Sequence, residues 1–195
     1  MFRSNFGLDY DAAFIRAITY TFHSDVVNND TNGTTLSQAN DSKWTWSNTI
    51  NYNFDIKEAH NFQLLAGVEL FRQNRVDFSG HNYTYALENT DYMWPDASTG
   101  IEKSTGNKSA YSLLSLFGKV DYNWNDLLLA SFTIRRDGSS RFGKNNKYGV
   151  FPAATIGYRL SKNIQKEWLN DLKLRASWGK TGNQAISNTA RYALY

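Results

Sequence analysis

The sequence predicts an all-β fold, an antiparallel up-and-down transmembrane β-barrel that is partial, with about eight strands of a larger barrel. Three observations predict this fold class. Apolar and polar residues alternate along successive segments, the longest segments run for 12 residues or more, and the connections alternate between short and long. Strands of soluble proteins are usually nearer five or six residues, so these longer segments favour strands that cross a membrane.

The clearest alternation lies in the first half of the chain, in residues 43–56. One face of this segment is almost wholly apolar and the other is polar: Trp44, Trp46, Asn48, Ile50, Tyr52, Phe54 and Ile56 against Lys43, Thr45, Ser47, Thr49, Asn51, Asn53 and Asp55. The segment from Phe62 to Leu70 repeats the pattern. Weaker examples at Phe2–Tyr10 and Phe14–Phe22 are expected to be two strands joined by a short turn near Asp11.

Four further strands are predicted in the second half of the chain. They are Leu114–Trp124, Leu127–Asp137, Tyr148–Leu160 and Leu172–Trp178. In every predicted strand the apolar residues fall mainly at even-numbered positions, so we expect the even face to contact lipid and the odd face to line a lumen. Between the last two strands, the segment Ser161–Asp171 could form one or two helical turns.

The connections predict a sheet with two unlike ends. Short turns are expected at Lys57–His60 and Asn125–Asp126, long loops at Asp25–Ser42 and Gly80–Ser109, and a tip of moderate length at Arg141–Lys147. In outer-membrane barrels the short turns are periplasmic and the longer loops are extracellular. We therefore expect Gly80–Ser109 to lie outside the cell.

An alternative with the same alternation is a soluble β-sandwich that acts as a carbohydrate-binding or adhesion module. Such a sandwich would turn its apolar face towards a second sheet instead of towards lipid. The aromatic residues favour the membrane, because they gather near segment ends, where interfacial girdles lie. These residues are Trp44, Trp46, Tyr122, Trp124 and Trp178.

Composition excludes several classes of function. A net charge of +3 is too small to indicate nucleic-acid binding, and the absence of cysteine removes disulfides and thiolate metal sites. His23, His60 and His81 are scattered without ligand spacing, so neither a metal nor a cofactor is expected. Glu69 and Asp121 are assigned to the polar lumen wall instead of to acid–base catalysis, and we predict no enzyme activity.

One motif imitates a phosphate-binding loop. Gly138, Gly143 and Lys144 follow the G-x-x-x-x-G-K spacing, but Asn145 stands where that loop needs a hydroxyl for magnesium. The residues after it are rich in Gly, Pro and β-branched types, which make a poor helix. We therefore interpret the stretch as a turn between strands.

The predicted long loop Gly80–Ser109 holds the candidate substrate-binding residues. Aromatic residues stand among Asn and Asp there, namely Tyr83, Tyr85, Tyr92 and Trp94. Flat rings beside polar hydrogen-bonding groups suit sugars or peptides, although such rings also serve to pack a loop against itself.

The C-terminal third resembles the SusC/RagA family of TonB-dependent outer-membrane transporters. The resemblance is carried by R-R-D-G-S-S-R-F-G at Arg135–Gly143, F-P at Phe151–Pro152, G-Y-R at Gly157–Arg159 and L-K-L-R-A-S-W-G-K-T-G-N-Q at Leu172–Gln184. The residues singled out as the family motif, with a structural role at the rim, are Arg135, Arg136, Asp137, Gly138, Ser139, Ser140, Arg141, Phe142, Gly143, Gly182 and Asn183.

This resemblance implies a 22-stranded barrel in the cell outer membrane, with a plug domain and a TonB box. It also implies contact with outer-membrane lipid, with a SusD-like surface lipoprotein and with the TonB complex, and import of oligosaccharides or peptides. Residues 1–195 are expected to be a section of the barrel domain, with the plug and TonB box absent.

Within the motif we expect a rim turn at Gly138–Lys147. Gly138 and Gly143 are expected to supply positive φ angles there. The charged residues Arg135, Arg136, Asp137 and Arg141 are expected to pair with one another or with lipid phosphates.

Overall fold

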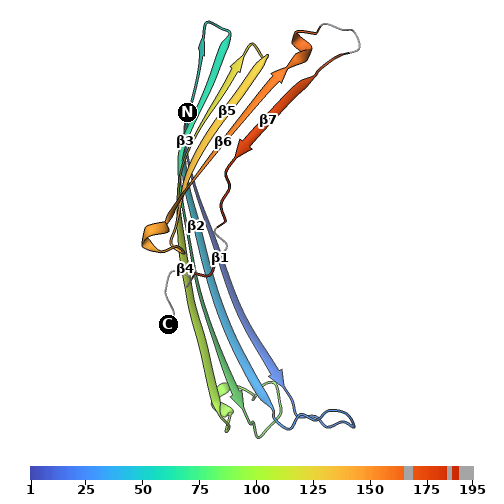
Figure 1. Cartoon of the computed structure of the whole chain (residues 1–195). Coiled ribbons are helices and arrows are strands. Elements are labelled where there is room, and N and C mark those ends of the chain that lie inside the picture. Colours follow the sequence, from blue (N-terminus) through green and yellow to red (C-terminus); the bar gives the residue numbers. More distant parts are fainter. Residues whose placement is uncertain (165–168, 184–185, 189–195) are drawn as a thin grey trace. The chain divides into compact units, whose positions relative to one another are not determined.

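The computed structural model describes residues 1–164, 169–183 and 186–188. Their strands form one open sheet of seven strands in chain order (Figure 1). Neighbours in the chain are neighbours in the sheet, and β4 to β7 pair antiparallel. The strands are β1 (Phe2–Thr19), β2 (Gly33–Ile56), β3 (His60–Tyr83), β4 (Glu102–Trp124), β5 (Leu128–Ser139), β6 (Tyr148–Arg159) and β7 (Lys173–Gly179). The predicted all-β meander is confirmed.

The chain forms two compact units. The first comprises Met1–Gly7, Trp44–Arg72 and Tyr111–Tyr195, and it contains the short turns together with β5, β6 and β7. The second comprises Leu8–Lys43 and Gln73–Ala110, and it contains the connection between β1 and β2 and the connection between β3 and β4.

The first strand is a single element, so the predicted turn near Asp11 is wrong, and the described residues form seven strands. The alternation keeps the same phase on both sides of Asp11, because Phe6, Tyr10 and Phe14 all occupy even positions. No Gly, Pro or Asn interrupts the chain between Tyr10 and Phe14. A true turn would have broken this phase or supplied such residues.

Strands β2, β3 and β4 extend well beyond the predicted segments, with 24, 24 and 23 residues. The predicted loops at Asp25–Ser42 and Gly80–Ser109 were therefore too long, and the actual connections are residues 20–32 and 84–101. The missed ends of β2 and β4 are largely polar on both faces, as in "TTLSQANDS" and "EKSTGNKSA". Such segments lack the apolar face on which the alternation signal depends.

The last three strands match the predictions within about two residues. Between β6 and β7 the structure forms a short 3₁₀ helix, η3 (Leu160–Lys162). The helical turns predicted within Ser161–Asp171 fall partly on residues 165–168, which lie outside the described residues.

The two predicted short turns are confirmed as tight hairpins. Both central residues of each turn have positive φ, at 51° and 55° for Lys57 and Glu58 and at 49° and 53° for Asn125 and Asp126. Two consecutive positive φ angles define the type I′ turn, whose twist matches that of the flanking strands. The second turn is closed by Leu127 N–H donating to the Trp124 carbonyl at 2.8 Å.

The pairing register places all even-numbered residues of β4 to β7 on one face. Even residues pair with even ones throughout, as in Leu116 with Arg136, Ala130 with Ile156, and Ala154 with Trp178. Apolar side chains on this face are exposed, and Ile156 retains 52% of its accessible surface. The face therefore presents apolar side chains to its surroundings.

The sheet has no sandwich core. Among the described residues the buried hydrophobic side chains are Tyr85 and Met93, and neither lies in a strand. A soluble sandwich would bury the whole apolar face against a second sheet. The described residues therefore give the soluble alternative no support. None of the described helices has the length and apolar character to span a membrane.

Candidate functional site

The connection between β3 and β4, residues 84–101, is anchored by an arginine of β1. The Arg16 guanidinium donates to the Met93 carbonyl at 3.0 Å and also to the Thr90 carbonyl. The same guanidinium stacks 4.1 Å from the centre of the Trp94 ring. Thr34 on β2 donates to the Met93 carbonyl at 2.9 Å, and the Met93 side chain is fully buried. The loop is thus packed onto the ends of two strands.

A second group of hydrogen bonds fixes the start of this loop. The Asn32 side chain donates to the Tyr85 carbonyl at 2.9 Å and accepts from the Tyr85 N–H at 2.6 Å. The Glu88 carboxylate accepts from the Thr21 hydroxyl at 2.6 Å and from the Asn32 amide at 2.9 Å. These hydrogen bonds lower the pKa of Glu88 below its ordinary value, and the hydrogen bond from Thr21 has the largest effect.

The four aromatic residues predicted to bind substrate have different environments. Tyr85 is buried at 5% exposure, so it supports the loop and offers no ring to a ligand. Tyr83 is half-buried, and its ring packs against Gly33. Tyr92 and Trp94 are exposed at 62% and 42%, and one face of Trp94 is covered by Arg16. The candidate surface therefore reduces to Tyr92 and the free face of Trp94.

The rings of Tyr92 and Trp94 stand on a backbone that is already ordered. Tyr92 N–H and Met93 N–H both donate to the Asn89 carbonyl at 3.0 Å, and the Asn89 side chain accepts from the Asp91 N–H at 2.9 Å. Exposed aromatic faces held in place lose little conformational entropy when a ligand stacks on them. Chemically, the surface can stack against a sugar ring or a peptide side chain.

The family-motif arginine Arg135 lies in a charge cluster on the odd face. Its Nε donates to the Asp137 carboxylate at 2.7 Å, while its Nη2 lies 3.5 Å from the Glu69 carboxylate and donates to the Ser115 hydroxyl at 2.9 Å. Pairing of Arg135 with Asp137, one of the expected options, is confirmed. The guanidinium also lies 5.6 Å from the Phe117 ring.

The other two motif arginines stack on tyrosines. Arg136 lies 4.4 Å from the Tyr148 ring centre, and Arg141 lies 3.7 Å from the ring centre of Tyr111. The Arg141 Nε also donates to the Asn188 side chain at 2.6 Å. Each planar guanidinium is thus held by a ring, in a geometry that a lysine would reproduce less well.

The expected positive φ angles at Gly138 and Gly143 are wrong, because the described glycines all have negative or extended φ. Gly138 lies in β5 opposite Tyr148, and a Cβ atom there would overlap the Tyr148 ring. Gly143 has φ −63° and ψ 164°, and a Cβ atom added to it would meet no other atom within 4 Å. Of these two glycines, only Gly138 is required by close approach.

The rest of the motif closes the rim connection. Ser139 is buried and its N–H donates to the Lys147 carbonyl at 3.0 Å, Ser140 N–H donates to the Ser112 carbonyl at 3.0 Å, and Phe142 N–H lies 3.4 Å from the Ser139 carbonyl. A strand follows at Tyr148 and no α-helix, which excludes a phosphate-binding loop.

The Gly182 and Asn183 part of the motif lies beside Phe151. A Cβ atom on Gly182 would overlap the Phe151 ring, and both residues line a small pocket of about 210 Å³. Gln184, the last residue of the motif, lies outside the described residues.

Sequence reasoning missed a repeated ion pair on the odd face. In each of β2, β3, β4 and β5, a basic and an acidic residue two positions apart lie within 4.0 Å of one another. The pairs are Asp41–Lys43 at 3.5 Å, Arg75–Asp77 at 3.7 Å, Lys119–Asp121 at 2.7 Å and Arg135–Asp137 at 2.7 Å. The sequence does show opposite charges at positions i and i+2, and two such residues lie on the same face of a strand. Glu69 and Asp121 each contact a different cation and do not form an acid–base pair.

The loop anchors Arg16, Asn32 and Glu88 were also missed. Arg16 was detectable, because it is the charged residue at an even position of a mostly apolar face. The three histidines make separate contacts: His23 with Asp30 at 3.4 Å, His60 with the Tyr122 hydroxyl at 2.7 Å, and His81 with the Thr35 hydroxyl at 3.0 Å. Within the described ranges no three His, Cys, Asp or Glu residues form a metal-binding group.

The long strands form a meander in which tight turns join consecutive strands. One face of the sheet is apolar, and the other is polar and carries ion pairs. These features define a section of an outer-membrane β-barrel wall. The chain belongs to the TonB dependent receptor-like, beta-barrel family, which matches residues 1–193. It is 34% identical over 158 residues to TonB-dependent receptor P39 of Formosa agariphila, covering 76% of this chain and 14% of that protein.

One further curated protein and one solved structure are similar to this chain. The TonB-dependent receptor SusC of Bacteroides thetaiotaomicron is 39% identical over 95 residues, covering 47% of this chain and 10% of that protein. A solved structure described as the RagAB peptide importer in the "open-open" state superimposes with a TM-score of 0.90 at 23% identity, over 99% of this chain and 21% of that one. At this identity the superposition shows the fold alone.

Membership of this family places the barrel wall in the bacterial outer membrane. Proteins of the family are transporters and not enzymes. The chain spans between a tenth and about a fifth of the length of the relatives that it matches.

Proposed function

We propose that this chain is part of the barrel of a SusC/RagA-like TonB-dependent transporter that imports oligosaccharides or peptides across the outer membrane. The family match over residues 1–193 is the observation that carries the proposal. The complete transporter would add the remaining strands, a plug domain and a TonB box, with residues 1–195 as one section of the barrel. Energy would come from the TonB complex.

A SusD-like surface lipoprotein is the proposed partner. The similarity to the RagAB peptide transporter supports this, since the name RagAB joins two components. The loop 84–101, with Tyr92 and Trp94 exposed on it, is the proposed first contact for substrate in this part of the barrel. Stacking of a sugar or side chain on one ring contributes about 1 kcal/mol or more.

Ligand titration of the complete transporter, purified with its lipoprotein partner, tests the proposal. Defined oligosaccharides and defined peptides are titrated separately, because the residues of this chain do not favour either substrate. Tyr92→Ala combined with Trp94→Ala should weaken binding about tenfold or more. Tyr52→Ala, which removes an exposed ring from the even face, is the matched control and should leave binding unchanged. Unaltered affinity in the double variant would assign the loop a purely structural role. The absence of any uptake of either solute class would contradict the transport function.

A further inference from the structure

Arg136 lies where the apolar face of β5 ends. The even positions before it are Leu128, Ala130, Phe132 and Ile134, and Arg136 is the next residue on that face. In the sheet it pairs with Val150 of β6, directly beside the pair formed by Gly138 and Tyr148. The first charged side chain of this face is thus stacked on an aromatic ring, at 4.4 Å from its centre.

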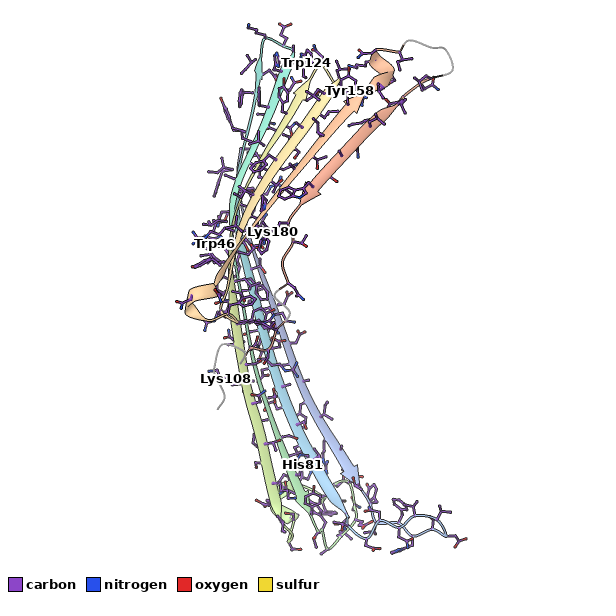
Figure 2. The ribbon with its side chains drawn as sticks, viewed as in Figure 1. Trp46, His81, Lys108, Trp124, Tyr158 and Lys180 are labelled. Carbon is purple, nitrogen blue, oxygen red and sulfur yellow. The ribbon has the colours of Figure 1, made fainter. Side chains whose placement is uncertain are left out.

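Tyr148 marks one border of an apolar band on β6. The even residues from Tyr148 to Tyr158 are Val150, Pro152, Ala154 and Ile156, all of them apolar. Trp124 of β4 and Tyr158 of β6 lie at the other border, one on each side of Leu128 of β5, at the end of the strands that carries the short turns (Figure 2). A rise of about 3.3 Å per residue and a strand tilt of about 40° put the two tyrosine rings about 25 Å apart along the barrel axis. This is the height of the lipid-facing band of an outer-membrane barrel.

A second cation lies next to the same ring. The ammonium group of Lys147 is 6.0 Å from the centre of the Tyr148 ring, and Lys147 is held because its carbonyl accepts from the Ser139 N–H at 3.0 Å. Both cations are exposed. Two positive charges therefore flank one ring at the level of the lipid headgroups.

Neither cation is neutralised by the part of the chain that the structure describes. Arg135 on the opposite face has two carboxylates, from Asp137 and Glu69, whereas no described carboxylate lies within 4.0 Å of Arg136 or Lys147. A cation at the edge of a lipid-facing band is stabilised by an anionic group of the membrane. Arginine in particular binds phosphate oxygens through two parallel N–H bonds.

We propose that Arg136 and Lys147, positioned by the Tyr148 ring, form a binding site for the phosphate of a lipid headgroup in the outer leaflet. The site depends on the chain being part of a membrane barrel and not on the nature of the transported substrate. Failure of the substrate proposal would therefore leave it intact.

Native mass spectrometry of the complete transporter can test this site. The probe is diphosphoryl lipid A, and the same lipid with both phosphates removed is the comparison ligand. Wild type should retain the phosphorylated lipid more tightly. Arg136→Gln and Lys147→Gln should each weaken retention about fivefold and together about thirtyfold, since each cation near an anionic headgroup contributes a similar increment. Arg136→Lys should retain part of the affinity, because it keeps the charge and loses the bidentate geometry.

The matched control is Lys173→Gln with Arg175→Gln, which removes two positive charges from the odd face of β7. This double variant should retain the lipid as wild type does. Equal retention by Arg136→Gln/Lys147→Gln and wild type overturns the proposal, as does equal loss in the control, which would indicate general charge attraction. If inorganic phosphate displaces the lipid at equal concentration, the site recognises free phosphate and the lipid assignment is wrong.

Discussion

The Tyr148 ring lies across Gly138 on the neighbouring strand and leaves no room for a Cβ atom there. The Arg135–Asp137 ion pair lies on the opposite face of β5, and the Arg136 guanidinium stacks on the Tyr148 ring. A glycine covered by a cross-strand aromatic ring pins register in curved sheets. Gly138 thus positions the ring on which an arginine is stacked.

Replacing Gly138 by Ala should destabilise the barrel. The new methyl group must displace the Tyr148 ring, at a cost of about 1–3 kcal/mol for overpacking. Unfolding by urea of the complete transporter in lipid vesicles measures the change. Gly143→Ala is the control, because its φ is −63° and its surroundings are open. It should change the free energy of unfolding by less than about 0.5 kcal/mol. Equal effects of the two substitutions would contradict the account.

The two faces of β6 should respond differently to a new arginine. Ile156→Arg places a charge on the even face inside the apolar band, two residues from its Tyr158 border, at a cost below the about 2–4 kcal/mol of the bilayer midplane, whereas Thr155→Arg places it on the polar face. Folding yield of the complete barrel in lipid vesicles should fall much further for Ile156→Arg. Equal yields would show that the faces are assigned wrongly.

Removing Arg16 should loosen the loop 84–101. Arg16→Ala deletes the hydrogen bonds to the carbonyls of Thr90 and Met93 and the stack on Trp94. Hydrogen bonds of charged groups contribute about 1.5–3 kcal/mol, so amide exchange of residues 88–94 should accelerate about tenfold or more. Arg3→Ala on the same strand is the control. Unchanged exchange in Arg16→Ala would mean that other contacts hold the loop.

Acidification should release the start of the same loop. The pKa of Glu88 is lowered in the folded state by hydrogen bonds from Thr21 and Asn32. The stability that this carboxylate contributes is therefore fully present above its ordinary value of 4.5, and it is lost as the pH falls through the lowered pKa. Amide-exchange protection at Tyr85 should decline only below that ordinary value. Glu88→Gln should abolish this decline, and its persistence in that variant would point to another group.

The two ends of the hairpins should differ in accessibility from outside the cell. Ala97→Cys lies in the loop 84–101 and Glu58→Cys in a short turn, and both native residues are exposed. In the complete transporter on intact cells, a membrane-impermeant thiol reagent should label only Ala97→Cys, because short turns face the periplasm. Labelling of Glu58→Cys instead would show that the topology is inverted.

The sequence predicted best those elements that lie inside the apolar band. Strands β5 and β6 and both tight turns were placed closely, because a lipid-facing residue must be apolar at every second position. The ends of β2 and β4 were missed because neither face is distinctly apolar there, so the alternation does not distinguish such a strand from a loop. In β1 the alternation keeps one phase on both sides of Asp11, and this constant phase is better evidence for one strand than Asp11 is for a turn.

The candidate site was only partly predictable. Composition identified the aromatic loop, yet the burial of Tyr85 depends on the Asn32 side chain from a distant segment. The role of Gly138 was misjudged for a similar reason, since glycine serves both tight turns and close aromatic contacts. Only the register with Tyr148 decides between these roles.

The ion pairs two residues apart on β2 to β5 also bear on how the barrel assembles. Both partners belong to one strand, so each pair forms when that strand becomes extended and needs no neighbour. A strand waiting for its partner therefore already carries fixed, inward-pointing charges, which disfavour stray edge-to-edge association of unfinished sheets. The charges of the polar face thus disfavour wrong strand pairing during insertion, before the barrel has closed around a lumen.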